Sequence, residues 1–396
     1  MKIKHVLFIV ENNTVPNDPR VWRQAIAVKK WGYEVSVICR KEGTSKASYE
    51  NINGIDIYRH NVPPDLPTKI SFFIEYIVAI LLEFALAIRL YIKKPFHIIH
   101  AANPPDLIFF IGIFFKLFRV KYIFDVHDLS PELYSSVYKN NSGLIHKALV
   151  LAEKLSCKIA DVIITTNHSY QDVISNRNKI EKSRIFVVRN DPQLEEFLLS
   201  ESQGIQRVEG KKIILFLGAI NLQDGVIELM HALHYLIYSL NEKNISCVLI
   251  GSGRAITEVK KAVIQLNLKN YVDIKGPIYD RKLICDLLHN ADVCVEPAPF
   301  NEINNISTFI KILEYMASGK PIVAFDLKES RYSANGSAIF IQPGDTEGFA
   351  KEIKRLVNNP ELRNKIGSVG RERVRNEFNW NNSLKNLNAA YKTISA

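Results

Sequence analysis

Short apolar runs alternate along the chain with longer stretches of helical periodicity. In the first half, seven runs rich in β-branched residues and bounded by turn residues predict strands. They are HVLFIV (5–10), EVSVICR (34–40), IDIYRH (55–60), FHIIHAA (96–102), YIFDVH (122–127), VIITTN (162–167) and IFVVRN (185–190). Such alternation predicts a mainly parallel sheet with helices on both faces, whose ligands bind beyond the carboxyl ends of the strands.

The pattern restarts after a segment from Asp191 to Gly210 that is expected to link two domains. Six more strands are predicted: IILFLG (213–218), CVLIGSG (247–253), YVDIKG (271–276), VCVEP (293–297), PIVAFD (321–326) and AIFIQP (338–343). We therefore expect an α/β protein with two Rossmann-like domains, residues 1–195 and 210–375, and a cleft between them. The helical tail from Pro360 has no strand and must pack on something already built.

Two apolar segments are candidates for membrane-spanning helices. Residues 70–92 are interrupted by Glu75, Glu83 and Arg89, and residues 107–118 fall short of the ~20 that a spanning helix needs. Neither is expected to span. Two interpretations stay open: both are helices buried on the sheet, or one shows an apolar face to a bilayer. The basic residues beside such a face would be Lys93, Lys94, Lys116, Arg119 and Lys121.

Charge and cysteine content narrow the class of protein. The net charge of +10 is spread over both halves, with no basic run and no combined aromatic–basic RNA-binding pattern, so nucleic acid is not an expected partner. A phosphate-bearing ligand or an anionic membrane surface fits the charge. The 5 cysteines are scattered without a CxxC pair, and the first apolar run is too short for a signal peptide. A cytoplasmic protein without disulfides is expected.

The segment from Asn304 to Asp326 carries the most specific pattern. Phe309, Ile312, Leu313, Met316 and Ala317 form one apolar stripe at helical spacing. Ser307 is the expected N-cap, and Gly319 with Pro321 ends the helix. Lys311 and Glu314 then lie on the opposite, polar face.

Two interpretations of Lys311 and Glu314 remain open at this point. They form a surface ion pair, or they belong to a nucleotide site. In the second case the N–H groups near Ser307 and Thr308 bind a diphosphate, Lys311 adds charge, and Glu314 accepts hydrogen bonds from a ribose.

Residues 312–323 (ILEYMASGKPIV) resemble the nucleotide-sugar segment of family 4 glycosyltransferases of the GT-B fold, and the closest resemblance is to bacterial members that build exopolysaccharide, capsule or O-antigen. Similar residues recur at 18–23, 124–134, 188–190, 223–226 and 251–253. The resemblance implies two facing Rossmann domains, a nucleotide-sugar donor on the second, an acceptor on the first, retention at the anomeric carbon and no metal or cofactor. It also implies that the final helix, residues 376–396, packs back on the N-terminal domain.

Within this resemblance, Glu314 corresponds to the second glutamate of the family's Glu-x7-Glu pattern, which contacts the ribose, and Ile306 stands where the first is expected. Ala219 and Asp224 replace the Arg and Lys that neutralise the diphosphate in many members. The candidates for the missing positive charge are the helix start at Ser307, Lys311, Arg331 and Arg189. The glycines expected to approach the donor are Gly218, Gly225, Gly251 and Gly253.

In the first domain, His127 follows a predicted strand. The family pattern gives it a role beside the donor sugar or the reacting centre, whereas the plainer interpretation is a histidine that closes a strand end with Asp125 or Asp128 as its partner. Asp128 and Glu132 orient His127 or bind acceptor hydroxyls, although Glu132 after Pro131 equally suits the first turn of a helix.

The sequence thus predicts a cytoplasmic glycosyltransferase, peripheral on the inner face of the membrane, with His127, Lys311 and Glu314 as catalytic residues. Its substrates would be a nucleoside-diphosphate sugar and a polyprenyl-linked glycan, and the setting bacterial surface polysaccharide synthesis. Two alternatives stay open: a GT-B nucleotide-sugar epimerase, and a non-catalytic GT-B partner subunit.

Overall fold

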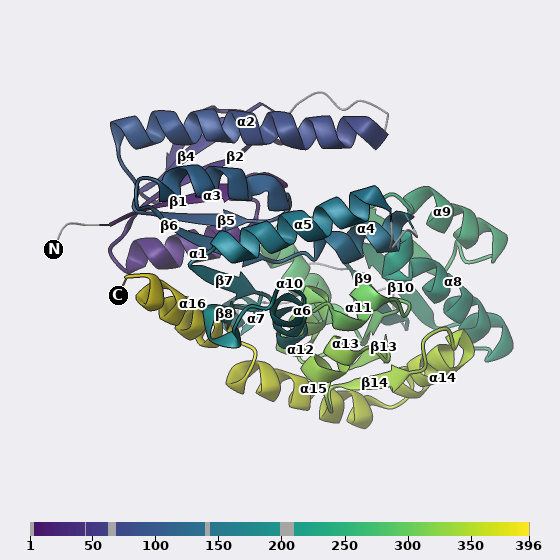
Figure 1. Cartoon of the computed structure of the whole chain (residues 1–396). Coiled ribbons are helices and arrows are strands. Elements are labelled where there is room, and N and C mark those ends of the chain that lie inside the picture. The colour runs from purple at the N-terminus through teal and green to yellow at the C-terminus, as the bar shows by residue number, and fades with distance from the viewer. Residues whose placement is uncertain (1–3, 44, 62–68, 139–142, 199–209, 396) are drawn as a thin grey trace. The chain divides into compact units, whose positions relative to one another are not determined.

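The computed structural model describes residues 4–43, 45–61, 69–138, 143–198 and 210–395 (Figure 1). The chain divides into two compact units, residues 1–189 with 383–396, and residues 190–382. Part of the expected linker, residues 199–209, lies outside the described residues.

The first unit is built on an eight-stranded sheet of order β3-β4-β2-β1-β5-β6-β7-β8, parallel except for the β3–β4 pair. Its strands are β1 (His5–Val10), β2 (Glu34–Arg40), β3 (Tyr49–Ile52), β4 (Ile55–His60), β5 (Ile98–Ala102), β6 (Lys121–Val126), β7 (Val162–Thr165) and β8 (Ile185–Val187). Its helices are α1 (Pro19–Lys30), α2 (Lys69–Lys93), α3 (Phe109–Lys116), α4 (Ser130–Tyr138), α5 (Leu144–Ile159), α6 (His168–Asn178) and most of α16 (Trp380–Ser395), with short turns η1 (Asp106–Ile108) and η2 (Lys182–Arg184).

The second unit has an all-parallel six-stranded sheet of order β11-β10-β9-β12-β13-β14. Its strands are β9 (Lys212–Leu217), β10 (Ile245–Ile250), β11 (Val272–Gly276), β12 (Val293–Glu296), β13 (Ile322–Phe325) and β14 (Ala338–Ile341). Its helices are α7 (Leu194–Leu198), α8 (Val226–His234), α9 (Ile256–Gln265), α10 (Arg281–Asn290), α11 (Glu302–Ile306), α12 (Ile310–Ala317), α13 (Lys328–Ala334), α14 (Thr346–Val357) and α15 (Pro360–Asn376). A short turn, η3 (Leu222–Asp224), precedes α8, and a π-helical segment, η4 (Tyr235–Ser239), continues it.

The predicted strands are all present, which confirms the α/β class. The antiparallel edge strand β3 was not predicted, because its sequence YENI is largely polar and exposed. All 5 cysteines are buried and free, as expected of a chain without a disulfide framework.

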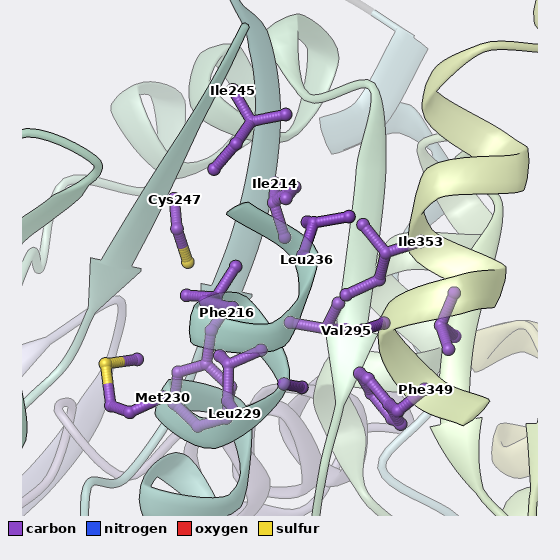
Figure 2. Close-up of a cluster of buried hydrophobic side chains, with 14 of the residues drawn as sticks. Ile214, Phe216, Leu229, Met230, Leu236, Ile245, Cys247, Val295, Phe349 and Ile353 are labelled. Atoms are coloured by element: carbon purple, nitrogen blue, oxygen red, sulfur yellow. The ribbon is translucent and has the colours of Figure 1, made fainter. Parts of the chain in front are cut away.

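The central parallel strands, such as β1, β5 and β12, are buried on both faces, which explains why their sequences are continuous apolar runs. Figure 2 shows one face of the second sheet, where Phe216 of β9 and Val295 of β12 meet Leu229 of α8 and Phe349 of α14. Because successive side chains of a strand point to opposite faces, Glu296 is directed away from this core.

The C-terminal helix is joined to the first unit by aromatic and polar contacts. The hydroxyl of Tyr391 lies 2.9 Å from His100 Nδ1, and its ring packs edge-on against Trp31 and Tyr33. Asn386 Nδ2 donates to the carbonyl oxygen of Val187 at 2.8 Å. A strandless helix therefore completes the layer that contains α1.

Candidate functional site

Three loops at the carboxyl ends of β9, β10 and β12 touch one another in the second unit. A Cβ on Gly251 (φ 142°) would lie 1.8 Å from the Gly218 oxygen, and one on Gly225 (φ 73°) would lie 1.8 Å from the Pro297 oxygen. A Cβ on Gly253 would likewise come within 2.3 Å of a backbone oxygen in the β9 loop. Only glycine permits these approaches, so the predicted glycines Gly218, Gly225, Gly251 and Gly253 do lie together.

A cavity of about 260 Å³ opens where the loops after β9 and β10 meet. It is lined by Leu217, Gly218, Ala219, Ile250, Gly251, Ser252, Pro277, Ile278 and Tyr279. It therefore lies beyond the carboxyl ends of β9, β10 and β11, where ligands of parallel sheets bind. Tyr279 at its rim is 91% exposed, and no sequence pattern pointed to this residue.

Helix α12 begins later than predicted. The chain first forms the short helix α11, whose N-cap Asn301 accepts from the Asn304 N–H at 2.8 Å. Ser307 follows α11 and its hydroxyl donates to the Ile303 oxygen at 2.7 Å. The expectation that Ser307 caps the helix is therefore wrong: α12 starts at Ile310 after Phe309, and Ser307 and Thr308 lie before it. The predicted end is confirmed, because Gly319 follows the C-cap with φ 66°.

Lys311 and Glu314 are both buried, so the predicted polar face and the ion pair between them are wrong. The reason is that each side chain has another partner. Lys311 Nζ lies 2.8 Å from Glu296 Oε2, and Glu314 Oε1 accepts from Arg281 Nη1 at 2.5 Å. Arg281 also donates to Glu196 at 2.7 Å. Sequence reasoning missed Arg281, which follows an ordinary N-cap and carries no pattern of its own.

Lys311 reaches the loop after β9. Its Cε would lie 3.1 Å from a Cβ built on Gly218, and its Nζ lies 4.3 Å from the centre of the Phe216 ring. Glu296, 1% exposed, was also missed, although a charged residue at the end of an apolar strand was a visible signal. Burial raises the pKa of Glu296, and the neighbouring Lys311 opposes that rise.

The departures from the family pattern have local structural roles. Asp224 accepts from the Asn221 N–H at 3.0 Å and so closes the turn η3. Asn304 Nδ2 donates to the Gln223 and Pro299 oxygens, both at 2.9 Å, which ties α11 to the same turn. Ile306 is the last residue of α11.

Arg331 lies at the surface of the second unit. Its Nε donates to Asp326 Oδ1 at 2.6 Å, and its guanidinium lies 4.6 Å from the centre of the Phe340 ring. The exposed side chain is therefore engaged with the end of β13.

In the first unit, the side chain of Asn103 binds the backbone of His127 and Asp128. Both N–H groups donate to Asn103 Oδ1, at 2.9 and 3.2 Å, and Asn103 Nδ2 donates to Asp106 and to the Asp128 oxygen. His127 is half-buried, and its Nδ1 has no hydrogen-bond partner among the described residues. Burial raises the pKa of Asp106 to about 6.

Asp125 is not the partner of His127. Its carboxylate accepts from Arg20 Nε at 2.9 Å, Arg20 Nη2 at 2.6 Å and Gln24 at 3.0 Å, and Arg20 also donates to the Val188 oxygen at 2.8 Å. Burial alone would raise the pKa of Asp125, but Arg20 and hydrogen bonding outweigh it and hold the pKa far below its usual value. Three of the motifs behind the family resemblance therefore meet in one buried ion pair.

Two other predicted residues have partners within the first unit. Glu132 pairs with Arg177, which also lies 3.4 Å from Glu153. The buried Arg189 donates its N–H to Ser383 at 3.0 Å. Sequence reasoning also missed Glu11, which follows β1 and so places a carboxyl group at the ligand-binding edge of the sheet. Burial raises the pKa of Glu11 to about 7.

Helices α2 and α3 lie side by side on one face of the first sheet (Figure 1), and the rings of Phe84 and Phe114 meet edge-on at 4.9 Å. Between the helices runs an apolar groove of about 410 Å³, lined by Ile88, Tyr91, Ile92, Phe114, Phe115 and Phe118. Around it, large apolar side chains are exposed: Ile77, Leu81, Ile92, Phe110, Ile113, Leu117 and Phe118. This surface is called the α2–α3 face below.

Within the described ranges, no helix combines the length and the apolar character needed to cross a bilayer. In the same ranges, His, Cys, Asp and Glu side chains do not gather in threes as a metal site would require.

Two family models match the chain. The model described as "Glycosyltransferase Family 4" matches residues 20–190, and "Glycosyl transferases group 1" matches residues 211–359. An uncharacterized glycosyltransferase of Methanocaldococcus jannaschii is 23% identical, over 91% of this chain and 90% of its own length. The capsular polysaccharide biosynthesis glycosyltransferase CapM of Staphylococcus aureus is 26% identical, over 64% of this chain and 67% of its own.

Solved structures agree on the fold. Sucrose-phosphate synthase from Thermosynechococcus elongatus has a TM-score of 0.78 at 18% identity and covers 99% of both chains. Anabaena HepE in complex with UDP-glucose has a TM-score of 0.73 at 15% identity, over 98% of this chain and 99% of its own.

Two Rossmann-like units, with glycine-rich loops at the carboxyl ends of the second sheet, define the GT-B fold. The chain belongs to glycosyltransferase family 4. The predicted fold, family and enzyme class are thereby confirmed: the protein is a glycosyltransferase that uses a nucleotide sugar.

Proposed function

We propose that the protein transfers a sugar, with retention, from a nucleoside-diphosphate sugar to a hydroxyl of a lipid-linked glycan in bacterial surface polysaccharide synthesis. The observation that carries the donor half is the site in the second unit, where the cavity and the buried Lys311 both adjoin Gly218, and the buried Glu314 is bound by Arg281, two residues beyond Tyr279 at the cavity's rim. CapM supports the polysaccharide setting, and the UDP and UDP-sugar bound in HepE structures support the donor class.

The base and ribose would occupy the cavity between Ile250 and Tyr279, with Glu314 as the acceptor for the ribose hydroxyls. The diphosphate would then lie toward Gly218 and Lys311. Arg281 holds the Glu314 carboxylate in one orientation, which suits a group that must meet a diol.

The proposed reaction needs no strong base. The bond between the anomeric carbon and the diphosphate oxygen breaks, the bond to the acceptor oxygen forms, and the acceptor's proton passes to a donor phosphate oxygen. Lys311 stabilises the charge that develops on the departing diphosphate, which is the kind of interaction that lowers a barrier most. In this scheme His127 contacts the donor sugar, and Asp128 serves the acceptor. We propose that no metal is required.

The α2–α3 face supports a lipid-linked acceptor. An anionic membrane surface would cover this face and so hold the enzyme beside an acceptor anchored in the same membrane. Its exposed apolar side chains exceed what scattered surface residues explain. Basic residues border it, and among the described residues Lys93 and Arg119 have no ion-pair partner, so their charge is available to anionic lipids.

Calorimetric titration with UDP, GDP and ADP without metal tests the donor site. We expect one nucleotide to bind the wild type. Binding of none would favour a non-catalytic partner subunit, whereas conversion of a nucleotide sugar without any acceptor would favour an epimerase.

A vesicle assay tests the acceptor setting. We expect the protein to sediment with vesicles containing phosphatidylglycerol, and the variant Leu81→Ser/Leu117→Ser to sediment less. Equal sedimentation of both proteins would remove the membrane from the proposal and leave the donor site untouched.

A further inference from the structure

One carboxylate neutralises Lys311 in this structure. The ammonium lies 2.8 Å from Glu296 Oε2, and neither atom has a hydrogen-bond partner among the described residues apart from this ion pair. The side chain of Lys311 is 9% exposed and that of Glu296 is 1% exposed. The pair is therefore screened from solvent. In such a buried position a charge without a partner is costly.

Glu296 is fixed by its place on β12. The neighbouring Val295 is packed in the core on one face of the sheet (Figure 2), and alternation sends Glu296 to the other face. Its Oε1 accepts from the Ala298 N–H at 3.2 Å, which leaves Oε2 for Lys311.

We propose that Glu296 is a positioning residue for Lys311, and that it keeps the ammonium charged and aimed at the loop after β9 until the donor diphosphate arrives. This inference rests on the proposed function. Ala219 and Asp224 stand in that loop where many family members have an Arg and a Lys, so the charge of Lys311 replaces theirs.

The physical reason is the effect of burial on an amine. A buried lysine without a counter-charge loses its proton, because desolvation disfavours the charged form. A neutral amine would stabilise neither the bound nor the departing diphosphate. When the diphosphate attracts Lys311, Glu296 can itself take up a proton from solvent, since burial raises its pKa.

The test compares Glu296→Gln with Asp292→Asn. Asp292 lies at the opposite end of β12, is equally a buried carboxylate, and faces Lys212 at 3.8 Å and Arg363 at 3.5 Å. The two variants therefore remove similar charges from the two ends of one strand, and only Glu296 contacts Lys311.

The probe is UDP, or whichever of UDP, GDP and ADP binds the wild type, titrated from pH 7.5 to 9. We expect the affinity of Glu296→Gln to fall by up to about tenfold per pH unit, because UDP binding must then be coupled to the uptake of one proton from solvent by Lys311. The wild type and Asp292→Asn should stay nearly level. Binding of the corresponding nucleoside, which has no phosphate, should be the same in all three proteins.

A second variant separates positioning from folding. If Glu296 acts through Lys311, Glu296→Gln adds no further loss of UDP affinity to Lys311→Met. Additive losses, or parallel pH profiles of Glu296→Gln and the wild type, would overturn the inference. Failure of the wild type to bind any of the three nucleotides would instead count against the proposed function.

Discussion

In each unit a buried ion pair lies beside the carboxyl end of a parallel strand, Arg20–Asp125 in the first and Lys311–Glu296 in the second, and the two pairs differ in how many hydrogen bonds their carboxylates receive. Asp125 in the first unit receives two hydrogen bonds from Arg20 and one from Gln24. Glu296 in the second unit has one contact with Lys311 and one backbone donor. The pKa of Asp125 is lowered, whereas that of Glu296 is raised because burial outweighs Lys311.

The difference separates a structural pair from a pair that can exchange partners. A guanidinium bound at two points has little to gain from a new ligand. A point-charge ammonium with one carboxylate can move to a phosphate at small cost. Burial of a charged pair therefore does not by itself identify a functional group. The number of hydrogen bonds that each charged group receives must be counted as well.

The largest effect is expected from breaking the satisfied pair. Arg20→Ala leaves Asp125 buried without its cation, so the free energy of unfolding at pH 7 should fall by about 3–5 kcal/mol. Urea unfolding measures it. Because the folded pKa of Asp125 is depressed, the pair stabilises above the unfolded pKa near 4, and the difference from wild type should shrink as the pH falls below about 4.

Arg23→Ala, on the exposed side of α1, is the control, and it should cost less than 1 kcal/mol. If Arg20→Ala also lowered the free energy of unfolding by less than about 1 kcal/mol, Asp125 would tolerate the loss of its cation. The distinction between the two pairs would then be wrong.

The second effect is on turnover. Lys311→Met keeps the apolar stem but removes the charge, so kcat should fall by about 10²–10³ while the donor KM changes less. Steady-state kinetics measure it, with Lys260→Met on the surface of α9 as the control. A loss confined to KM would mean that Lys311 binds the ground state and the transition state equally and does not lower the barrier of the chemical step.

The strands and the family were open to prediction from sequence, whereas the partners of the site residues were not. Apolar runs such as VCVE follow from burial on both faces, and residues 312–323 carry the family pattern. The contact between Lys311 and Glu296 joins α12 to β12 through tertiary packing, which no local pattern encodes. The start of α12 was misplaced for a related reason, because Asn301 caps a short helix ahead of it and Ser307 ends that helix.

The third effect is on donor affinity. Glu314→Gln keeps the shape of the side chain but weakens its hydrogen bonds to a ribose, which should cost about 1.5–3 kcal/mol in UDP binding and less in kcat. Calorimetry measures it, with Glu347→Gln on the surface of α14 as the control. Because Arg281 would keep Glu196 as a partner, the fold should hold. Unchanged affinity would separate Glu314 from the nucleotide.

The smallest effect is expected at Arg331, whose ion pair is as close as the buried ones but exposed. Arg331→Ala should cost only about 0–1 kcal/mol of stability, because water screens the pair with Asp326. UDP affinity should stay within about twofold, since the guanidinium is already bound to Asp326 and packed on Phe340 and an exposed charge adds little. A loss above fivefold, with unchanged thermal stability, would make Arg331 a phosphate ligand. It would also show that exposed cations, and not only the buried Lys311, supply the charge that Ala219 and Asp224 lack.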